Sequence, residues 1–247
     1  MIRRIFPPSA CCALALLGLA PLHAQVPASG TTFTVTQAQA EVKAGRFDRA
    51  LAVLQAPHSV PPADAKALRL AVADVQYAWA QSLLTTSPAQ ALPHYQAALA
   101  TDRTLRPAQA AADLNETAVA CVGLRRPVAA IGSFQQALPF YQKVGDKDGQ
   151  GNTLMGLGIM YFSLHQPGEA VGFLQRALPF YRQAGDKEGQ ANVLNNLGNV
   201  YRSGGQPGKA ADFYRQAVLF YQQAEDKGGA AGALKSLSAT RERPASR

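Results

Sequence analysis

The sequence predicts an all-α fold in which antiparallel helix pairs stack into a solenoid, and three observations support this. First, residues 107–225 repeat with a period of 40 residues, which lies in the range typical of solenoids. Second, apolar residues inside each copy recur at helical spacing. Third, a proline stands in the middle of each copy, where it would separate two helices.

Three regular repeats are predicted at residues 107–145, 146–185 and 186–225, because residues forty positions apart match in type. The matching positions hold small, aromatic, acidic and proline residues in the same order: Ala137, Ala177 and Ala217; Phe140, Phe180 and Phe220; Tyr141, Tyr181 and Tyr221; Asp146, Asp186 and Asp226; Pro127, Pro167 and Pro207. In such an array each unit buries its apolar face only against its neighbours.

Each copy is predicted to form two helices, as the last full repeat illustrates. Asp186 is a suitable N-cap for the first helix, whose apolar residues recur at helical spacing. Ser203-Gly204-Gly205 would end that helix, and Pro207 suits the first turn of the second helix. In the two middle copies we expect the second helix to end at Gly145 and Gly185.

Small residues at fixed positions are expected to let the two helices of a pair approach closely. Gly158 and Gly198 lie in first helices, and Ala170 and Ala210 lie in second helices. A larger side chain at any of these positions would wedge the two helices apart.

The order of large and small residues resembles the tetratricopeptide repeat. The family pattern, large-x-x-Leu-Gly-x-x-Tyr and then Ala, an aromatic residue and Ala, stands here as Leu194-x-x-Leu197-Gly198-x-x-Tyr201, Ala210, Tyr214 and Ala217. The common repeat has about 34 residues. The longer spacing with Gly-Asp-Lys joints is similar to a long-repeat subfamily that includes Leu-Gly-Asn-type cell-polarity adaptors, kinesin light chains and many bacterial proteins. The resemblance covers residues 107–237 and implies a right-handed α-solenoid.

The first 24 residues are predicted to be a secretory signal peptide and not part of the fold. Arg3-Arg4 precedes an apolar core at residues 10–20, and small residues around Ala24 form a suitable cleavage site. The apolar core is too short to span a membrane. We therefore expect export, by the general secretory or the twin-arginine route, and a periplasmic location.

Outside the regular array the repeat pattern weakens. Residues 25–34 are polar and are expected to form a flexible segment, followed by a degenerate first repeat at residues 35–56. A proline-rich joint cannot continue that helix, so an irregular repeat is predicted after it, at residues 63–101. At the other end, residues 226–243 are predicted to form a single helix that caps the solenoid.

The charge of the chain argues against a nucleic-acid ligand. The full chain has a net charge of +8. Residues 1–24 hold two arginines and no acidic residue, so their removal leaves 22 basic and 16 acidic residues, a net charge of +6. The basic residues are scattered, whereas nucleic-acid-binding proteins gather them on one face or along one helix.

No pattern of catalytic or metal-binding residues is visible. Cys121 aligns with tyrosines on the buried face of first helices and is expected to be an apolar core residue. His58, His94 and His165 lack metal-ligand spacing and are expected on the surface. Glycine pairs near Gly156 lack the context of a phosphate-binding loop. We therefore predict a non-enzymatic protein without a metal or cofactor.

The candidate binding site is the concave groove that first helices line in tetratricopeptide repeats. The resemblance implies that positions two, five, nine and twelve of each first helix point into the groove, when the Leu-Gly pair is counted as positions seven and eight. The candidate residues, one of them in the capping helix, are Asn115, Asn152, Met155, Ile159, Phe162, Asn192, Asn195, Asn199, Arg202 and Lys235.

One helix face carries three asparagines, Asn192, Asn195 and Asn199. This needs an explanation, because asparagine is a poor helix former. One interpretation is that exposed polar residues vary freely. The other is that side-chain amides, each with a donor and an acceptor, grip the backbone of a peptide. Related long-repeat proteins use asparagines in this way. An apolar patch of the preceding repeat, Met155, Ile159 and Phe162, would lie beside them.

The main functional prediction is therefore a protein-interaction scaffold that binds a peptide segment of an envelope protein in the groove. Two alternatives stay open: a structural element that binds cell-wall polymers or other polyanions, and the repeat part of a protein whose catalytic domain is absent. We expect no caspase-like protease domain of the kind that follows some bacterial arrays, because only about 20 residues follow the last helix pair. The sequence predicts no oligomeric state.

Overall fold

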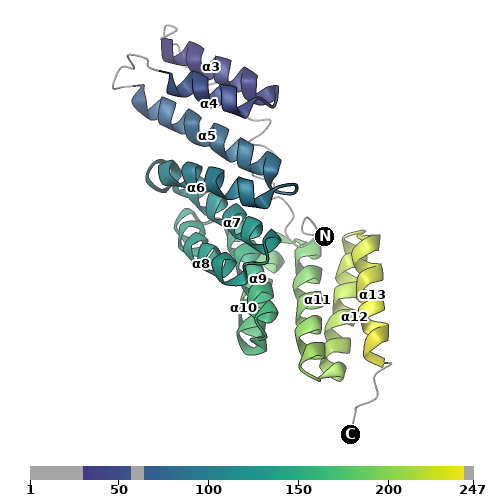
Figure 1. Cartoon of the computed structure of the whole chain (residues 1–247). Coiled ribbons are helices and arrows are strands. Elements are labelled where there is room, and N and C mark those ends of the chain that lie inside the picture. Colours follow the sequence, from purple (N-terminus) through teal and green to yellow (C-terminus); the bar gives the residue numbers. More distant parts are fainter. Residues whose placement is uncertain (1–29, 57–63, 242–247) are drawn as a thin grey trace. The chain divides into compact units, whose positions relative to one another are not determined.

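Residues 30–56 and 64–241 are described in a computed structural model of the chain, and every regular element among them is an α-helix (Figure 1). Consecutive helices pack against one another within each part of the structure, so the predicted all-α class of packed helix pairs is confirmed. The predicted signal peptide, the proline-rich joint at residues 57–62 and residues 242–247 lie outside the described residues.

The chain divides into two compact units at the boundary between residues 126 and 127, and each unit is described by itself. In the first unit the helices are α3 (Gly30–Lys43), α4 (Phe47–Gln55), α5 (Ala65–Leu83), α6 (Pro88–Leu105) and α7 (Pro107–Gly123). Each of these helices packs against the next, and α3 also contacts α5. This unit holds the degenerate and irregular repeats predicted from the sequence.

The second unit, residues 127–241, holds the regular array. Its helices are α8 (Pro127–Val144), α9 (Lys147–Ser163), α10 (Pro167–Ala184), α11 (Lys187–Ser203), α12 (Pro207–Gln223) and α13 (Lys227–Arg241). Consecutive helices pack against one another, and α11 also contacts both α9 and α13. The three first helices of this unit are therefore neighbours, which is the arrangement needed for a shared binding face.

The structure corrects the predicted flexible segment at residues 25–34. Helix α3 begins at Gly30, so residues 30–34 belong to a helix. The reason is burial, because Thr34 is buried and Val35 packs against the core of this unit. That core contains a buried leucine of α4, Leu54, which gives the helix an apolar partner.

Two other predicted boundaries differ from the structure. Helix α6 continues to Leu105, four residues past the predicted end of the irregular repeat at residue 101. The added turn contains Asp102, which is buried and ion-paired with Arg106. In addition, the boundary between the two units falls inside the predicted repeat at residues 107–145, because α7 belongs to the first unit and α8 to the second.

Aspartate caps begin the first helices of the second unit, as predicted for Asp186. Its carboxylate accepts a hydrogen bond from the backbone N–H of Gly189 at 2.8 Å. Asp146 and Asp226 make the same bond at 2.9 Å, each with the glycine three residues farther on. These bonds satisfy backbone donors that have no partner inside the helix.

Left-handed residues end the helices at repeating positions. The predicted helix-ending glycines are confirmed, because Gly145 has a φ of 72° and Gly185 a φ of 70°. The equivalent residue of the next repeat is Glu225, with a φ of 58°. At the other turn, Gly205 has a φ of 70° and the equivalent His165 a φ of 59°. A non-glycine residue in this region costs roughly 1–2 kcal/mol, so the sequence did not indicate the left-handed conformation at Glu225 and His165.

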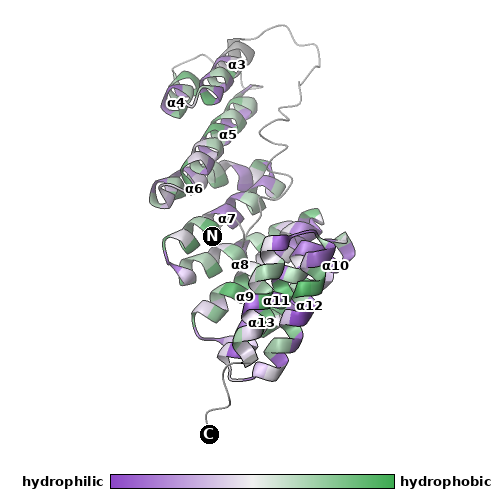
Figure 2. Ribbon diagram, turned by 90° about the vertical axis from the view of Figure 1, so that its right-hand side faces the viewer, coloured by the Kyte–Doolittle hydropathy of each residue, from purple (hydrophilic) through white to green (hydrophobic). Residues whose placement is uncertain are grey.

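The core of the second unit packs α9, α10 and α11 around apolar residues, and Figure 2 shows hydrophobic residues on α9 beside its label. These residues lie in the second half of α9, because its first half, residues 147–153, is mostly polar. The close approaches expected at small residues are confirmed. A Cβ atom added to Gly158 would lie 2.7 Å from the Leu174 side chain, and one added to Gly198 would lie 2.6 Å from the Tyr214 ring. The fully buried Tyr214 ring has no space to move into.

We predict that Gly198→Leu destabilises the second unit by about 1–3 kcal/mol or more, because the new side chain overlaps the Tyr214 ring. The damage should concentrate in residues 167–237, since repeats couple to their neighbours. Hydrogen exchange followed along the chain measures this distribution. Gly208→Leu is the matched control, because no atom lies within 4 Å of a Cβ at Gly208. Uniform loss of protection from residue 30 to residue 241 would contradict the solenoid interpretation.

Candidate functional site

The predicted groove residues of the second unit lie on the neighbouring helices α9, α11 and α13. The four asparagines among them, Asn152, Asn192, Asn195 and Asn199, are half-buried, whereas Arg202 and Lys235 are exposed. We call the row formed by these four asparagines and Arg202 the asparagine face. Its members come from two neighbouring first helices, so one elongated ligand could reach all of them.

Tyrosine hydroxyls from second helices hold three of these asparagines. The Tyr181 hydroxyl of α10 donates a hydrogen bond to Asn152 Oδ1 at 2.6 Å. The Tyr221 hydroxyl of α12 donates in the same way to Asn192 Oδ1 at 2.7 Å. These two bonds are equivalent, because both partners are shifted by forty residues. Sequence reasoning missed them, since each bond joins residues 29 positions apart.

Asn199 is held by a different tyrosine. The Tyr214 hydroxyl donates to Asn199 Oδ1 at 2.8 Å, and the Tyr214 side chain is fully buried. In the preceding repeat the equivalent positions hold Ile159 and Leu174, so the polar pair of the last repeat stands where an apolar pair stands one repeat earlier. Burial raises the pKa of Tyr214 above its ordinary value, although the nearby Arg202 guanidinium opposes this rise. The hydroxyl is therefore a donor at neutral pH.

The tyrosine bonds leave the donor side of each amide available. In Asn152, Asn192 and Asn199 the oxygen accepts from a tyrosine, and in the described residues the Nδ2 group has no hydrogen-bond partner. A side-chain amide nitrogen carries two N–H donors. Fixing the oxygen also fixes the direction of these donors, so the asparagine face presents oriented donors to a ligand that carries acceptors.

Asn195 differs from the other three asparagines. Its Oδ1 atom is buried and has no hydrogen-bond partner among the described residues. A buried polar atom without a partner costs roughly 1–3 kcal/mol. The described contacts of α11 therefore do not explain why an asparagine stands at this position.

The structure corrects the predicted apolar patch. Met155 is 1% exposed and belongs to the core, where its sulfur lies 3.9 Å from the Tyr181 hydroxyl. Position five of α9 therefore faces the core and not the groove, because the core can accept the long apolar side chain of Met155. Ile159 and Phe162 are half-buried and pack against the same core. Asn115 lies half-buried in α7 of the first unit and is not placed relative to the others.

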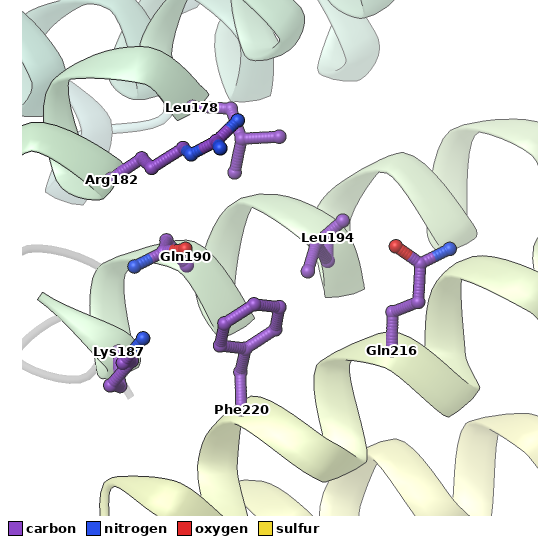
Figure 3. A pocket seen from close by; sticks show the side chains of 7 residues that line it. All are labelled: Leu178, Arg182, Lys187, Gln190, Leu194, Gln216 and Phe220. Atoms are coloured by element: carbon purple, nitrogen blue, oxygen red, sulfur yellow. The ribbon is translucent and has the colours of Figure 1, made fainter. Parts of the chain in front are cut away.

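A pocket that sequence analysis did not predict lies on another side of α11 (Figure 3). Its volume is about 400 Å³, and the lining residues come from α10, α11 and α12: Leu178, Arg182, Lys187, Gln190, Leu194, Gln216 and Phe220. Lys187 Nζ stands 5.4 Å from the centre of the Phe220 ring. No sequence motif marks this pocket, because each helix contributes only two or three residues.

The first unit contains a cluster of three carboxylates around one arginine, of which Asp102 and Asp113 are buried and Asp74 is exposed. Arg106 donates to both oxygens of Asp102, at 2.7 and 3.1 Å, and to Asp74 at 2.6 Å. Asp113 is fully buried nearby and accepts a hydrogen bond from Gln109 at 3.3 Å. Burial, reinforced by the Asp102 charge, raises the pKa of Asp113 to about 8. The positions equivalent to Asp113 hold Thr153 and Val193.

Asp113 should make the stability of the first unit depend on pH. Its raised pKa means that the folded chain keeps a proton that the unfolded chain releases near pH 4. Stability is therefore greatest below pH 4 for this group and falls as the pH rises towards about 8. We predict that Asp113→Asn matches the wild type near pH 4 and is more stable by about 1–3 kcal/mol at pH 9.

Urea unfolding at several pH values measures this difference. The control is Asp212→Asn, because Asp212 is exposed and pairs only with exposed Arg215 in the described structure. An Asp113→Asn variant whose stability follows the wild-type pH curve would show that the Asp113 carboxyl is not the titrating group.

No group of histidine, cysteine or acidic residues in residues 30–56 and 64–241 could hold a metal ion. Cys121 is buried as predicted, and burial raises the pKa of its thiol. His165 is exposed as predicted, and His58 lies outside the described residues. His94 is half-buried, in contrast to the prediction, because its ring stacks on Trp79 with the centroids 4.1 Å apart. No described helix has the length and apolar character of a bilayer-crossing segment.

A family model of the tetratricopeptide repeat matches residues 109–183 and, shifted by forty residues, residues 149–223. Residues 109–223 are therefore tetratricopeptide repeats. The resemblance inferred from Leu197-Gly198 and its surroundings is confirmed at the level of the repeat family. Proteins with this repeat are commonly interaction scaffolds and generally non-catalytic. A comparison with curated protein sequences finds no significant match.

Solved structures support the same fold. Aspartyl phosphate phosphatase F from Bacillus subtilis matches with a TM-score of 0.68 and 14% identity over 85% of this chain. A STAND signal-transduction ATPase with a tetratricopeptide repeat sensor, from Pyrococcus horikoshii, has a TM-score of 0.64 and 17% identity over 85% of this chain. BtubC from P. vanneervenii has a TM-score of 0.58 and 17% identity over 89% of this chain.

The lengths of these structures differ. The chain covers 55% of the Bacillus phosphatase and 32% of the Pyrococcus ATPase, whereas it covers 96% of BtubC. At these identities the likeness concerns the fold alone. It shows that these solved structures share the fold of stacked helix pairs described above.

Proposed function

We propose that this chain is a non-enzymatic interaction scaffold that binds an extended peptide segment of a partner protein along its asparagine face. The observation that carries the proposal is the pairing of asparagine oxygens with buried tyrosine hydroxyls, which leaves oriented Nδ2 donors on α9 and α11. An extended peptide carries a regular series of backbone carbonyl acceptors, which such donors fit without reading its side chains.

The small free energy of each hydrogen bond favours a partner that contacts both α9 and α11. A hydrogen bond contributes about 0.5–1.5 kcal/mol net, so one asparagine alone cannot hold a peptide. Several such bonds together with the half-buried Ile159 and Phe162 can reach a micromolar Kd, which corresponds to about 8 kcal/mol. The exposed Arg202 at the end of the face favours a peptide with an acidic residue near that position.

A catalytic role is less well supported. One structural neighbour is named a phosphatase, but that name belongs to that protein. In the described residues of this chain no group of histidine, cysteine or acidic residues could hold a metal ion, and the free thiol of Cys121 is buried. The buried Asp102–Arg106–Asp113 cluster has its strongest contacts inside the fold. The proposal is therefore binding and not chemistry.

Removal of the donors should weaken peptide binding without unfolding the array. Asn199→Ala alone is unsuitable, because it would leave the buried Tyr214 hydroxyl unpaired. We predict that the triple variant Asn195→Ala, Asn199→Ile and Tyr214→Leu binds at least about tenfold more weakly, since two donor groups are lost. Its stability should stay close to wild type, because Ile159 and Leu174 already form the same apolar pair one repeat earlier.

Peptides selected from a random-sequence display library on the wild-type chain, and envelope proteins captured from a membrane extract, supply the ligands for this test. Kd values from fluorescence anisotropy and thermal melts are compared between variants. Gln175→Ala, an exposed amide on α10, is the matched control and should change neither quantity. Equal binding by the triple variant and the wild type, with equal melting temperatures, would contradict the asparagine-face proposal.

We further propose that the chain is exported to the periplasm and that its array belongs to the long-repeat subfamily. Support for export is the basic start, apolar stretch and small residues around Ala24. Support for the subfamily is the 40-residue spacing of helix starts at Pro127, Pro167 and Pro207. An envelope protein is therefore the proposed source of the bound peptide.

Export predicts a shortened mature protein. When the full chain is expressed in a Gram-negative host, N-terminal sequencing of the periplasmic fraction should find Gln25 or a residue close to it as the first residue. Replacement of Leu16 and Leu17 by arginine should keep the protein in the cytoplasm, because it interrupts the apolar core. An intact N-terminus on exported or membrane-bound protein would contradict the prediction.

A further inference from the structure

The pocket between α10, α11 and α12 has a chemistry of its own, separate from the asparagine face. Its walls are apolar: Leu178 comes from α10, Leu194 from α11 and Phe220 from α12. Figure 3 shows Arg182 reaching from α10 towards Leu178, while Phe220 and Gln216 rise from α12 on the other side of the same space. The volume of about 400 Å³ lies within the range of pockets that hold small ligands.

Two cations stand at this pocket without a neutralising partner. Arg182 and Lys187 are exposed, and neither forms an ion pair in the described part of the chain. Lys187 is positioned by the Phe220 ring, 5.4 Å from its centre. Because a guanidinium and an ammonium beside apolar walls attract an anion more strongly than they would in open water, the pocket favours a ligand with one carboxylate.

A buried amide adds a hydrogen-bond acceptor to the pocket. Gln190 is 5% exposed, and its Nε2 group donates to the Asp186 carbonyl at 3.0 Å and the Tyr181 carbonyl at 3.5 Å. Both donors point at the backbone, so the oxygen faces the pocket that Gln190 lines, as Figure 3 shows. In the described residues this oxygen has no partner, and it is not sealed from solvent. A ligand N–H would satisfy it.

These groups define a ligand with three features: a carboxylate for Arg182 and Lys187, an N–H for Gln190, and an apolar body for Leu178, Leu194 and Phe220. We propose that the pocket binds an N-acylated amino acid with an apolar side chain. The same chemistry could come from a free small molecule or from the last residue of a peptide chain. The proposal is independent of peptide binding on the asparagine face, because that face lies on a different side of α11.

The preceding repeat allows a comparison at the position of Arg182. The position equivalent to Arg182 holds Gln142, whereas the leucines, the lysine and the phenylalanine recur as Leu138, Leu154, Lys147 and Phe180. The apolar frame and its Lys–Phe contact are therefore general to the array, since Lys147 Nζ also stands 5.6 Å from the Phe180 ring. An arginine at the position of Arg182 is particular to the last pocket, whereas the preceding repeat has its arginine, Arg176, at the position equivalent to Gln216. Gln142 shows that the lattice already tolerates glutamine at the Arg182 position.

The test is titration of the full chain with N-acetyl-leucine, followed by amide and methyl NMR shifts. The shifts should be saturable and centred on α10–α12. N-acetyl-leucinamide, which lacks the carboxylate, and 4-methylpentanoic acid, which lacks the N–H, should each bind at least about tenfold more weakly. Arg182→Gln should weaken binding of the acid by a similar factor. Arg176→Gln is the control, because Arg176 is exposed on the same helix over the Phe173 ring.

The source of the ligand is resolved by one further probe, the peptide acetyl-Gly-Gly-Leu. Binding more than tenfold tighter than N-acetyl-leucine assigns the site to a chain end, and similar binding assigns it to a small molecule. Equal binding of the acid and its amide, equal effects of Arg182→Gln and Arg176→Gln, or no saturable shift up to the solubility limit would each overturn the proposal. The triple variant of the asparagine face should bind the acid normally, so failure of one proposal is distinguishable from failure of the other.

Discussion

The regular array depends on one tyrosine at the end of each second helix, which joins three helices. The Tyr181 ring lies so close to Gly189 of α11 that an added Cβ would come within 2.2 Å of it. Its backbone carbonyl accepts the Asp186 N–H at 3.0 Å, and its hydroxyl donates to Asn152 of α9 at 2.6 Å. One residue thus fixes α9, α10 and α11, and Tyr221 repeats the arrangement forty residues later.

This set of contacts between one tyrosine and three helices, called the tyrosine joint below, changes how the asparagines are explained. Asparagine costs up to roughly 0.7 kcal/mol in a helix relative to alanine, whereas a buried hydroxyl without a partner costs roughly 1–3 kcal/mol. Pairing with a tyrosine is therefore sufficient to account for Asn152, Asn192 and Asn199, and neither free variation nor ligand binding is needed to explain their presence. Among the described residues no tyrosine hydroxyl pairs with the Asn195 oxygen, so this explanation does not apply to Asn195. Function is then an additional use of amides that the fold already holds in place.

The features that the sequence predicted are those that depend on neighbouring residues. The Asp186 cap, the Pro207 start and the Gly185 end act within one turn of a helix, so their patterns are visible in the chain. What the sequence could not predict depends on distant residues. Met155 faces inward because of the core contributed by α10 and α11, and the Asn–Tyr bonds and the pocket each need two or three helices to be in position.

The stacking of repeats also decides where a binding surface can be rigid. Leu154 and Leu194 occupy equivalent positions and are 2% and 3% exposed, because a second helix follows each of them. Leu234 stands at the same position in α13 and is 49% exposed. A preformed surface avoids part of the ordering cost of binding, and α11 has the tyrosine joint on both sides, through Tyr181 and Tyr221. The asparagine face and the pocket both include α11, so both surfaces lie on a helix that tyrosines hold from two sides.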